Sequence, residues 1–123
     1  MKNTVLVVDD DELIRKTVKR VLESAGIEVQ TAESGPMCLD IMSQGFEGLV
    51  LMDVVMPEMS GWDTITAMVE KGYAEGNIIC MFTGKEVPDE RMEHVKEYVL
   101  DYIRKPFNNE KLIALIKEYL SYL

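Results

Sequence analysis

The stretch LVLMDVVMPEMSG, residues 49–61, places four consecutive apolar residues directly before a carboxylate, Asp53. The apolar run shows no polar alternation and is followed by Pro57 and Gly61, which is typical of a strand buried on both faces of a parallel sheet. Asp53 would then end this strand at the carboxyl edge of the sheet. In open parallel α/β sheets that edge is where ligands bind. Asp53 is therefore the first candidate functional residue.

Four further segments have the composition of strands. Residues 4–8 (TVLVV) and 78–82 (IICMF) are apolar almost throughout, as expected in the centre of a sheet. Residues 27–32 (IEVQTA) alternate apolar with polar side chains and residues 99–104 (VLDYIR) are mixed, which favours the two edges. With residues 49–52 as the third strand, the order 2-1-3-4-5 satisfies both preferences. This is the flavodoxin-like arrangement of a five-stranded parallel sheet.

The segments between the strands carry apolar residues at helical spacing, and each is bounded by a capping residue, Gly or Pro. The apolar positions are Leu13, Ile14, Val18, Val21, Leu22 and Ala25 in the first; Met37, Leu39, Ile41 and Met42 in the second; Trp62, Ile65, Met68 and Val69 in the third; Met92, Val95 and Val99 in the fourth, which starts near Pro88; and Leu112, Leu115, Ile116 and Tyr119 in the fifth. Ser34 and Asn108 are the predicted caps of the second and fifth helices. Alternating strands and helices predict an α/β three-layer sandwich. We expect Trp62 to be partly exposed.

Length and composition limit the classes of function. A chain of 123 residues predicts one domain, 1–123, and the last helix runs almost to the end of the sequence, so we expect no output domain. A formal net charge of -9 argues against binding of nucleic acid by this domain. No segment is long and apolar enough for a signal peptide or a membrane span, so we expect no membrane partner. Cys38 and Cys80 lack metal or redox spacing, which favours reduced core cysteines in a cytoplasmic protein.

The parallel topology brings polar residues from four strand ends to one edge of the sheet. They are Asp9, Asp10, Asp53, Thr83 and Lys105. Three carboxylates at one place repel one another unless a cation is present, and a hard divalent ion bound by oxygen ligands, Mg²⁺ or Mn²⁺, fits them. A carboxylate nucleophile, a metal, a lysine and a hydroxyl donor are the components that phosphoryl transfer needs.

The pattern of these residues is also that of a known family. The matching residues are Asp9-Asp10, the string Asp53-x-x-Met56-Pro57-x-Met59-x-Gly61, Thr83-Gly84, and Tyr102-x-x-Lys105-Pro106-Phe107. Each motif alone is weak, but together, at the ends of the predicted strands, they are specific. The chain resembles the receiver domain of two-component response regulators, of the chemotaxis-receiver type, over essentially its whole length.

The resemblance implies a role for each residue at this edge. Asp53 is expected to accept a phosphoryl group from the phosphohistidine of a histidine kinase or a histidine phosphotransfer protein. Asp10, Asp53, the backbone carbonyl of Val55 and, through water, Asp9 are expected to bind the metal. Lys105 is expected to pair first with the acceptor and then with the phosphoryl group. The domain would be regulatory rather than an enzyme, although it would assist its own phosphorylation and dephosphorylation.

The resemblance also implies a switch. The Thr83 hydroxyl would move to the phosphate while the Tyr102 ring turns inward, which is a shift between two packings. The output face for an unknown downstream protein would be the fourth helix, the fifth strand and the fifth helix. The Lys105-Pro106 bond is expected to be cis.

Three positions depart from the family pattern or set its timing. Residues 98–101 (YVLD) stand where many relatives have small residues and Gly before the switch aromatic, so the local packing and the output surface are expected to differ. Val55 and Lys85, two residues beyond the acceptor and the threonine, occupy positions that modulate phosphoryl lifetime in the family. Because Val55 has no hydrogen-bonding group to hold an attacking water, we expect a long-lived phosphoryl group.

Alternative functions are weaker but distinct. Each polar residue alone has an ordinary explanation; the acidic run Asp9-Asp10-Asp11, for example, is a common solvated helix start. A flavin carrier would need a phosphate cradle where these acids stand. A magnesium phosphatase would want an acid or base at Val55. The main alternative is a degenerate receiver that acts as a phosphorylation-independent protein-interaction module.

Overall fold

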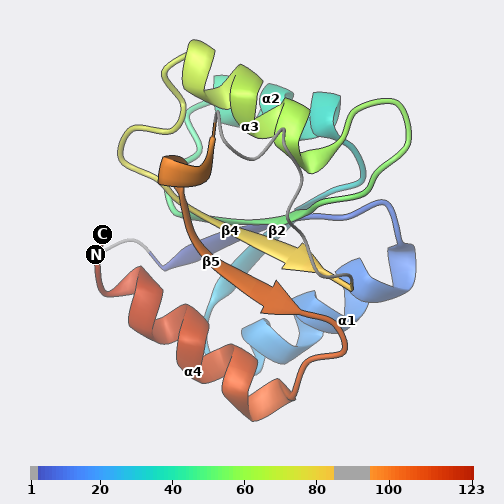
Figure 1. Ribbon diagram of the computed structural model, residues 1–123. Coiled ribbons are helices and arrows are strands. Elements are labelled where there is room, and N and C mark those ends of the chain that lie inside the picture. The colour runs from blue at the N-terminus through green and yellow to red at the C-terminus, as the bar shows by residue number, and fades with distance from the viewer. Residues whose placement is uncertain (1–2, 85–94) are drawn as a thin grey trace.

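The computed structural model describes residues 3–84 and 95–123 and contains one parallel sheet (Figure 1). Its strands are β1 (Thr4–Val8), β2 (Glu28–Ala32), β3 (Leu49–Asp53), β4 (Ile78–Thr83) and β5 (Val99–Arg104). The order is β2-β1-β3-β4-β5, and every neighbouring pair is parallel. The predicted flavodoxin-like order is therefore confirmed, with the apolar strands in the centre and the mixed strands at the edges.

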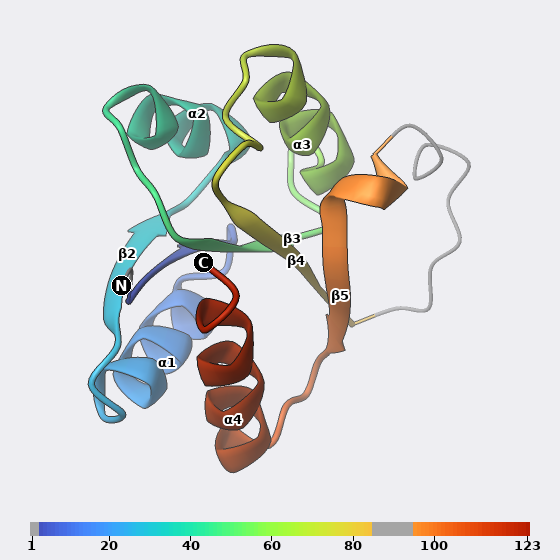
Figure 2. The same cartoon turned by 90° about the vertical axis from the view of Figure 1, so that its left-hand side faces the viewer.

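Helices cover both faces of the sheet. They are α1 (Glu12–Glu23), α2 (Gly35–Ser43), α3 (Gly61–Glu70), α4 (Asn109–Leu120) and a short 3-10 helix, η2 (Lys96–Tyr98). Figures 1 and 2 show α1 and α4 on one face and α2 and α3 on the other, which is the predicted three-layer sandwich. The predicted fifth helix is α4. The predicted helix that starts near Pro88 falls largely outside the described residues.

Polar side chains define where the helices begin. Ser34 accepts a hydrogen bond from the Met37 N–H at α2, and Asn108 accepts one from the Lys111 N–H at α4, as predicted. Asp11 does the same for α1, because its carboxylate accepts from the Leu13 N–H at 2.9 Å. Each bond satisfies a backbone donor that has no partner within its helix.

The alternation of side chains along the strands builds two cores, one on each face of the sheet. The core towards α2 and α3 includes Cys38, and the core towards α1 and α4 includes Cys80. Both cysteines are free and buried, and burial raises the pKa of each to about 12, so both thiols stay protonated. Among the described residues, no helix has the length and apolarity that crossing a membrane requires.

Three side chains differ from the predicted pattern. Met37, assigned to the apolar side of the second helix, is 43% exposed. Leu13, assigned to the apolar side of the first helix, lies in the first turn of α1 and is 71% exposed. Trp62 was expected to be partly exposed but is only 1% exposed. Its ring lies between α3 and the sheet, where it contacts Tyr102 of β5 at a centroid distance of 6.2 Å.

Candidate functional site

Three carboxylates converge at the carboxyl edge of the sheet because β1 and β3 are neighbours. Asp9, Asp10 and Asp53 each offer an oxygen atom, and these oxygens all lie within 4.8 Å of one another. Asp9 and Asp53 are buried, with 1% and 7% exposure, whereas Asp10 is exposed to solvent. The predicted cluster is therefore present, and Asp10 is its solvent-exposed member.

Hydrogen bonds fix the position of Asp9. Its N–H donates to the carbonyl of Ala32 in β2 at 3.1 Å, and its Oδ1 accepts from the Asp11 N–H at 2.9 Å. The guanidinium of Arg15 donates to the Asp9 carbonyl at 2.7 Å. Asp9 is therefore oriented by groups on both sides of it, before any metal or phosphate is bound.

Lys105 reaches the cluster from the end of β5. Its Nζ lies 2.8 Å from Asp9 Oδ2 and 3.4 Å from Asp53 Oδ1, and it stands 5.0 Å from the centre of the Phe82 ring. Its own N–H donates to the Thr83 carbonyl at 2.8 Å, which ties the end of β5 to the end of β4. The Lys105-Pro106 peptide bond is cis, as the resemblance implied.

The electrostatics of the cluster depend on burial. Burial and then the negative charge of Asp9 raise the pKa of Asp53 from 3.8 to about 7, although Lys105 opposes this. Burial alone would lower the pKa of Lys105, but its hydrogen bond to Asp9 and the charge of Asp53 outweigh this and raise it. Two adjacent carboxylates thus share one cation, and ionisation of Asp53 is unfavourable unless more positive charge is present.

The loop after Asp53 folds back against the strand. The Gly61 N–H donates to the Val54 carbonyl at 2.8 Å, and a Cβ at Gly61 would stand 2.2 Å from the carbonyl oxygen of Asp53. Only glycine allows this approach, which explains the Gly in the motif. The side chain of Val55 points to solvent and is 65% exposed.

The remaining predicted residues lie on β4 and β5. Thr83 ends β4 beside Asp53 of β3 and is 5% exposed. Tyr102 faces the α3 side, and its hydroxyl is buried with no hydrogen-bond partner among the described residues. Lys85 lies outside the described residues. Phe82 and Trp62 belong to the surroundings of the site, although the sequence assigned neither to it; the only sequence signal was their position next to Thr83 and Gly61.

Comparison with known proteins identifies the family. A family model for the response regulator receiver domain matches residues 5–117. The chain belongs to the response regulator receiver domain family. The transcriptional regulatory protein CpxR of Escherichia coli (strain K12) is 32% identical to this receiver domain over 118 residues, which cover 96% of this chain and 49% of CpxR. The transcriptional regulatory protein SrrA of Staphylococcus aureus (strain NCTC 8325 / PS 47) is 30% identical to this chain over 120 residues, which cover 98% of this chain and 48% of SrrA.

The receiver domain is also similar to solved structures. A CheY-like receiver domain protein from Methanospirillum hungatei JF-1 is 44% identical with a TM-score of 0.92, covering 97% of this chain and 94% of that one. TrrA from Thermotoga maritima, solved in complex with Mg²⁺ and BeF, is 30% identical with a TM-score of 0.82, covering 98% and 100%. The receiver domain spans about half the length of the curated relatives above. It is a regulatory domain of two-component signalling.

Proposed function

We propose that Asp53 accepts a phosphoryl group from the phosphohistidine of a histidine kinase or a histidine phosphotransfer protein. The observation that carries this is the convergence of Asp9, Asp10 and Asp53 within 4.8 Å, with the Lys105 ammonium 3.4 Å from Asp53. In the transfer, an Asp53 oxygen forms a bond to phosphorus while the P–N bond of phosphohistidine breaks. The electron pair of that bond stays on the imidazole nitrogen.

The donor set fits a divalent cation that prefers oxygen ligands, Mg²⁺ or Mn²⁺. Asp10, Asp53 and the Val55 carbonyl would hold it directly, and Asp9 through water. Such an ion supplies positive charge that favours ionised Asp53 and neutralises the phosphoryl oxygens. Because Asp10 is the exposed member of the cluster, the ion would enter from its side. Lys105, held by Asp9 at 2.8 Å, stands ready to pair with the transferred group.

Phosphorylation would act through Thr83 and Tyr102. A phosphoryl group on Asp53 adds charge and hydrogen-bond acceptors next to β4, and the Thr83 hydroxyl would donate to it. Movement of Thr83 would favour the packing in which Tyr102 lies inward. This would change the output surface that a downstream protein recognises, which comprises the predicted fourth helix, β5 and α4. The downstream partner is proposed to be a protein. Neither nucleic acid nor a membrane is proposed to bind this domain, and its location is proposed to be cytoplasmic.

Incubation with acetyl phosphate and Mg²⁺ tests the proposal. We expect a single adduct of phosphate mass that is stable in acid and labile in base, absent in Asp53→Asn and absent when a chelator removes the metal. Asp40→Asn, an exposed aspartate on α2, makes the same charge change away from the cluster and should leave the adduct intact. No adduct with acetyl phosphate or with phosphorylated histidine kinases would favour the degenerate, interaction-only receiver.

A further inference from the structure

Strand β5 contains one residue more than β4 along their shared ladder. Val99 pairs with Ile79 and Asp101 pairs with Cys80, so Leu100 has no partner on β4. Leu100 is 48% exposed. This arrangement is a β-bulge, in which two residues of one strand oppose a single residue of its neighbour.

The bulge determines which face of the sheet Tyr102 occupies. Successive side chains of a strand point to opposite faces, so one additional residue reverses every later position. Val99 packs in the core towards α3, so a regular strand would place Asp101 towards α3 and Tyr102 towards α4. The bulge exchanges them: Tyr102 pairs with Met81 and contacts Trp62 on the α3 side, while Asp101 lies on the α4 side.

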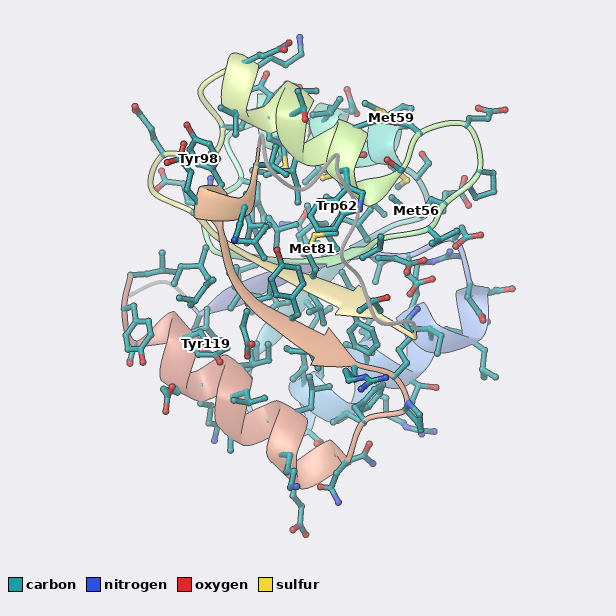
Figure 3. The ribbon with its side chains drawn as sticks, viewed as in Figure 1. Met56, Met59, Trp62, Met81, Tyr98 and Tyr119 are labelled. Carbon is teal, nitrogen blue, oxygen red and sulfur yellow. The ribbon has the colours of Figure 1, made fainter. Side chains whose placement is uncertain are left out.

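Asp101 makes two hydrogen bonds that belong to this bulged register. One carboxylate oxygen accepts from the N–H of Tyr102 at 2.8 Å, and the other accepts from the hydroxyl of Tyr119 on α4. Figure 3 shows Trp62 and Tyr119 on opposite sides of β5. In a regular register Asp101 would face away from Tyr119, so the bond between them would be lost.

We propose that Asp101 and Tyr119 are positioning residues for Tyr102, because their hydrogen bond selects the bulged register that holds the Tyr102 ring against Trp62. The placement of Tyr102 does not require phosphorylation, whereas its consequence for signalling rests on the proposed function. If phosphorylation of Asp53 favours inward Tyr102, then α4 and the site are coupled in both directions. A partner that draws α4 away from β5 would lower the population of the conformation in which Tyr102 lies against Trp62. It would thereby also lower the affinity of the site at Asp53 for a phosphoryl group.

If the Tyr119 hydroxyl had only a structural role, its removal would also lower the stability of the protein. The decisive measurement is therefore the position of the Tyr102 ring. The chain has a single tryptophan, so contacts between the Tyr102 ring and the Trp62 indole can be followed without overlap by NMR in metal-free protein. The test variant is Tyr119→Phe, which keeps the ring and removes the hydroxyl. The matched control is Tyr122→Phe, because that exposed hydroxyl is on the same terminal segment and donates to Glu118 at 3.1 Å.

We expect the Tyr102–Trp62 cross-peaks to weaken at least twofold in Tyr119→Phe, together with the backbone cross-peaks between Cys80 and Asp101, and to be unchanged in Tyr122→Phe. Asp101→Ala should behave like Tyr119→Phe, because it removes the acceptor of the Tyr119 hydroxyl. Wild-type intensity in a folded Tyr119→Phe, or no Tyr102–Trp62 cross-peak in the wild type, would overturn the proposal.

A second measurement tests the coupling to Asp53. An aromatic pair of this geometry changes an equilibrium by about two- to tenfold, so the apparent affinity for beryllofluoride with Mg²⁺ should fall by that factor in Tyr119→Phe and not in Tyr122→Phe. An unchanged affinity in Tyr119→Phe would overturn the coupling. Absence of any beryllofluoride binding in the wild type would instead count against Asp53 as acceptor, and the NMR measurement would still decide the placement of Tyr102.

Discussion

The ammonium of Lys105 forms its shorter contact, 2.8 Å, with the Oδ2 atom of Asp9. Its distance to Asp53 is longer, at 3.4 Å. In the metal-free protein the lysine therefore compensates chiefly the most buried carboxylate and leaves the proposed acceptor only partly neutralised. Burial and the charge of Asp9 therefore raise the pKa of Asp53 despite the opposing charge of Lys105.

Lys105→Met should destabilise the metal-free protein, because it removes the cation from two buried carboxylates. We expect a loss of about 2 kcal/mol in the free energy of unfolding at pH 8, less than for a fully buried pair because Lys105 is partly exposed. The loss should be smaller at pH 5, where Asp53 is protonated. Urea unfolding in chelator measures both values. Lys19→Met, an exposed lysine on α1, is the control, and an equal loss there would show a general effect of charge.

Asp10→Asn should separate metal binding from folding. Asp10 is exposed and adds repulsion to Asp9 and Asp53, so its neutral amide should leave the metal-free protein as stable as the wild type or more stable. Tight Mg²⁺ binding should disappear, as calorimetric titration would show. Asp40→Asn provides the same charge change with metal binding retained. A clearly less stable Asp10→Asn protein would mean that hydrogen bonds of Asp10 outweigh the repulsion.

The pH dependence of stability should carry the signature of Asp53. Its pKa is about 7 in the folded protein, above its ordinary 3.8, so the folded state binds the proton more tightly than the unfolded state. This contribution to stability is complete below about pH 4 and is lost as the pH rises through about 7. In chelator, the wild type should therefore lose stability between pH 5 and pH 8 relative to Asp53→Asn. Parallel curves for the two proteins would contradict the raised pKa.

Much of this structure could be predicted because the signals are local. The apolar runs ending at Asp9, Asp53 and Thr83 each define a strand and its end, and parallel pairing then forces those ends together. The burial of Trp62 could not be predicted, because it depends on contact with Tyr102, 40 residues later in the sequence. A helix pattern alone gives no information about such a partner.

The bulge at Leu100 escaped prediction for a related reason. Residues 99–104 are mixed in polarity, so period-2 alternation does not show that one residue is additional. The register of β5 depends instead on the hydrogen bond of Asp101 to Tyr119, a residue of α4, and on the pairing of Asp101 with Cys80 of β4. The departure of residues 98–101 from the family pattern was visible in the sequence, but its geometric meaning was not.

Val55→Asn should shorten the life of the phosphoryl group. The Val55 side chain is 65% exposed beside the site, so an amide fits there without disturbing the core and can hold an attacking water, which valine cannot. We expect dephosphorylation severalfold faster than in the wild type, measured as loss of the phosphate adduct after the donor is removed. Val55→Ala lacks hydrogen-bonding groups and is the control. Equal rates for Asn and Ala variants would rule out this explanation.

Tyr102→Phe should stabilise the metal-free protein. The Tyr102 hydroxyl is buried and has no hydrogen-bond partner in residues 3–84 and 95–123, so its removal relieves a desolvation penalty of about 1 kcal/mol or more. Tyr119→Phe makes the same chemical change where the hydroxyl donates to Asp101, and should instead destabilise by about 1 kcal/mol. Opposite signs in urea unfolding are the expected result. A loss of stability in Tyr102→Phe as large as in Tyr119→Phe would mean that the Tyr102 hydroxyl is hydrogen-bonded in solution, for instance to water.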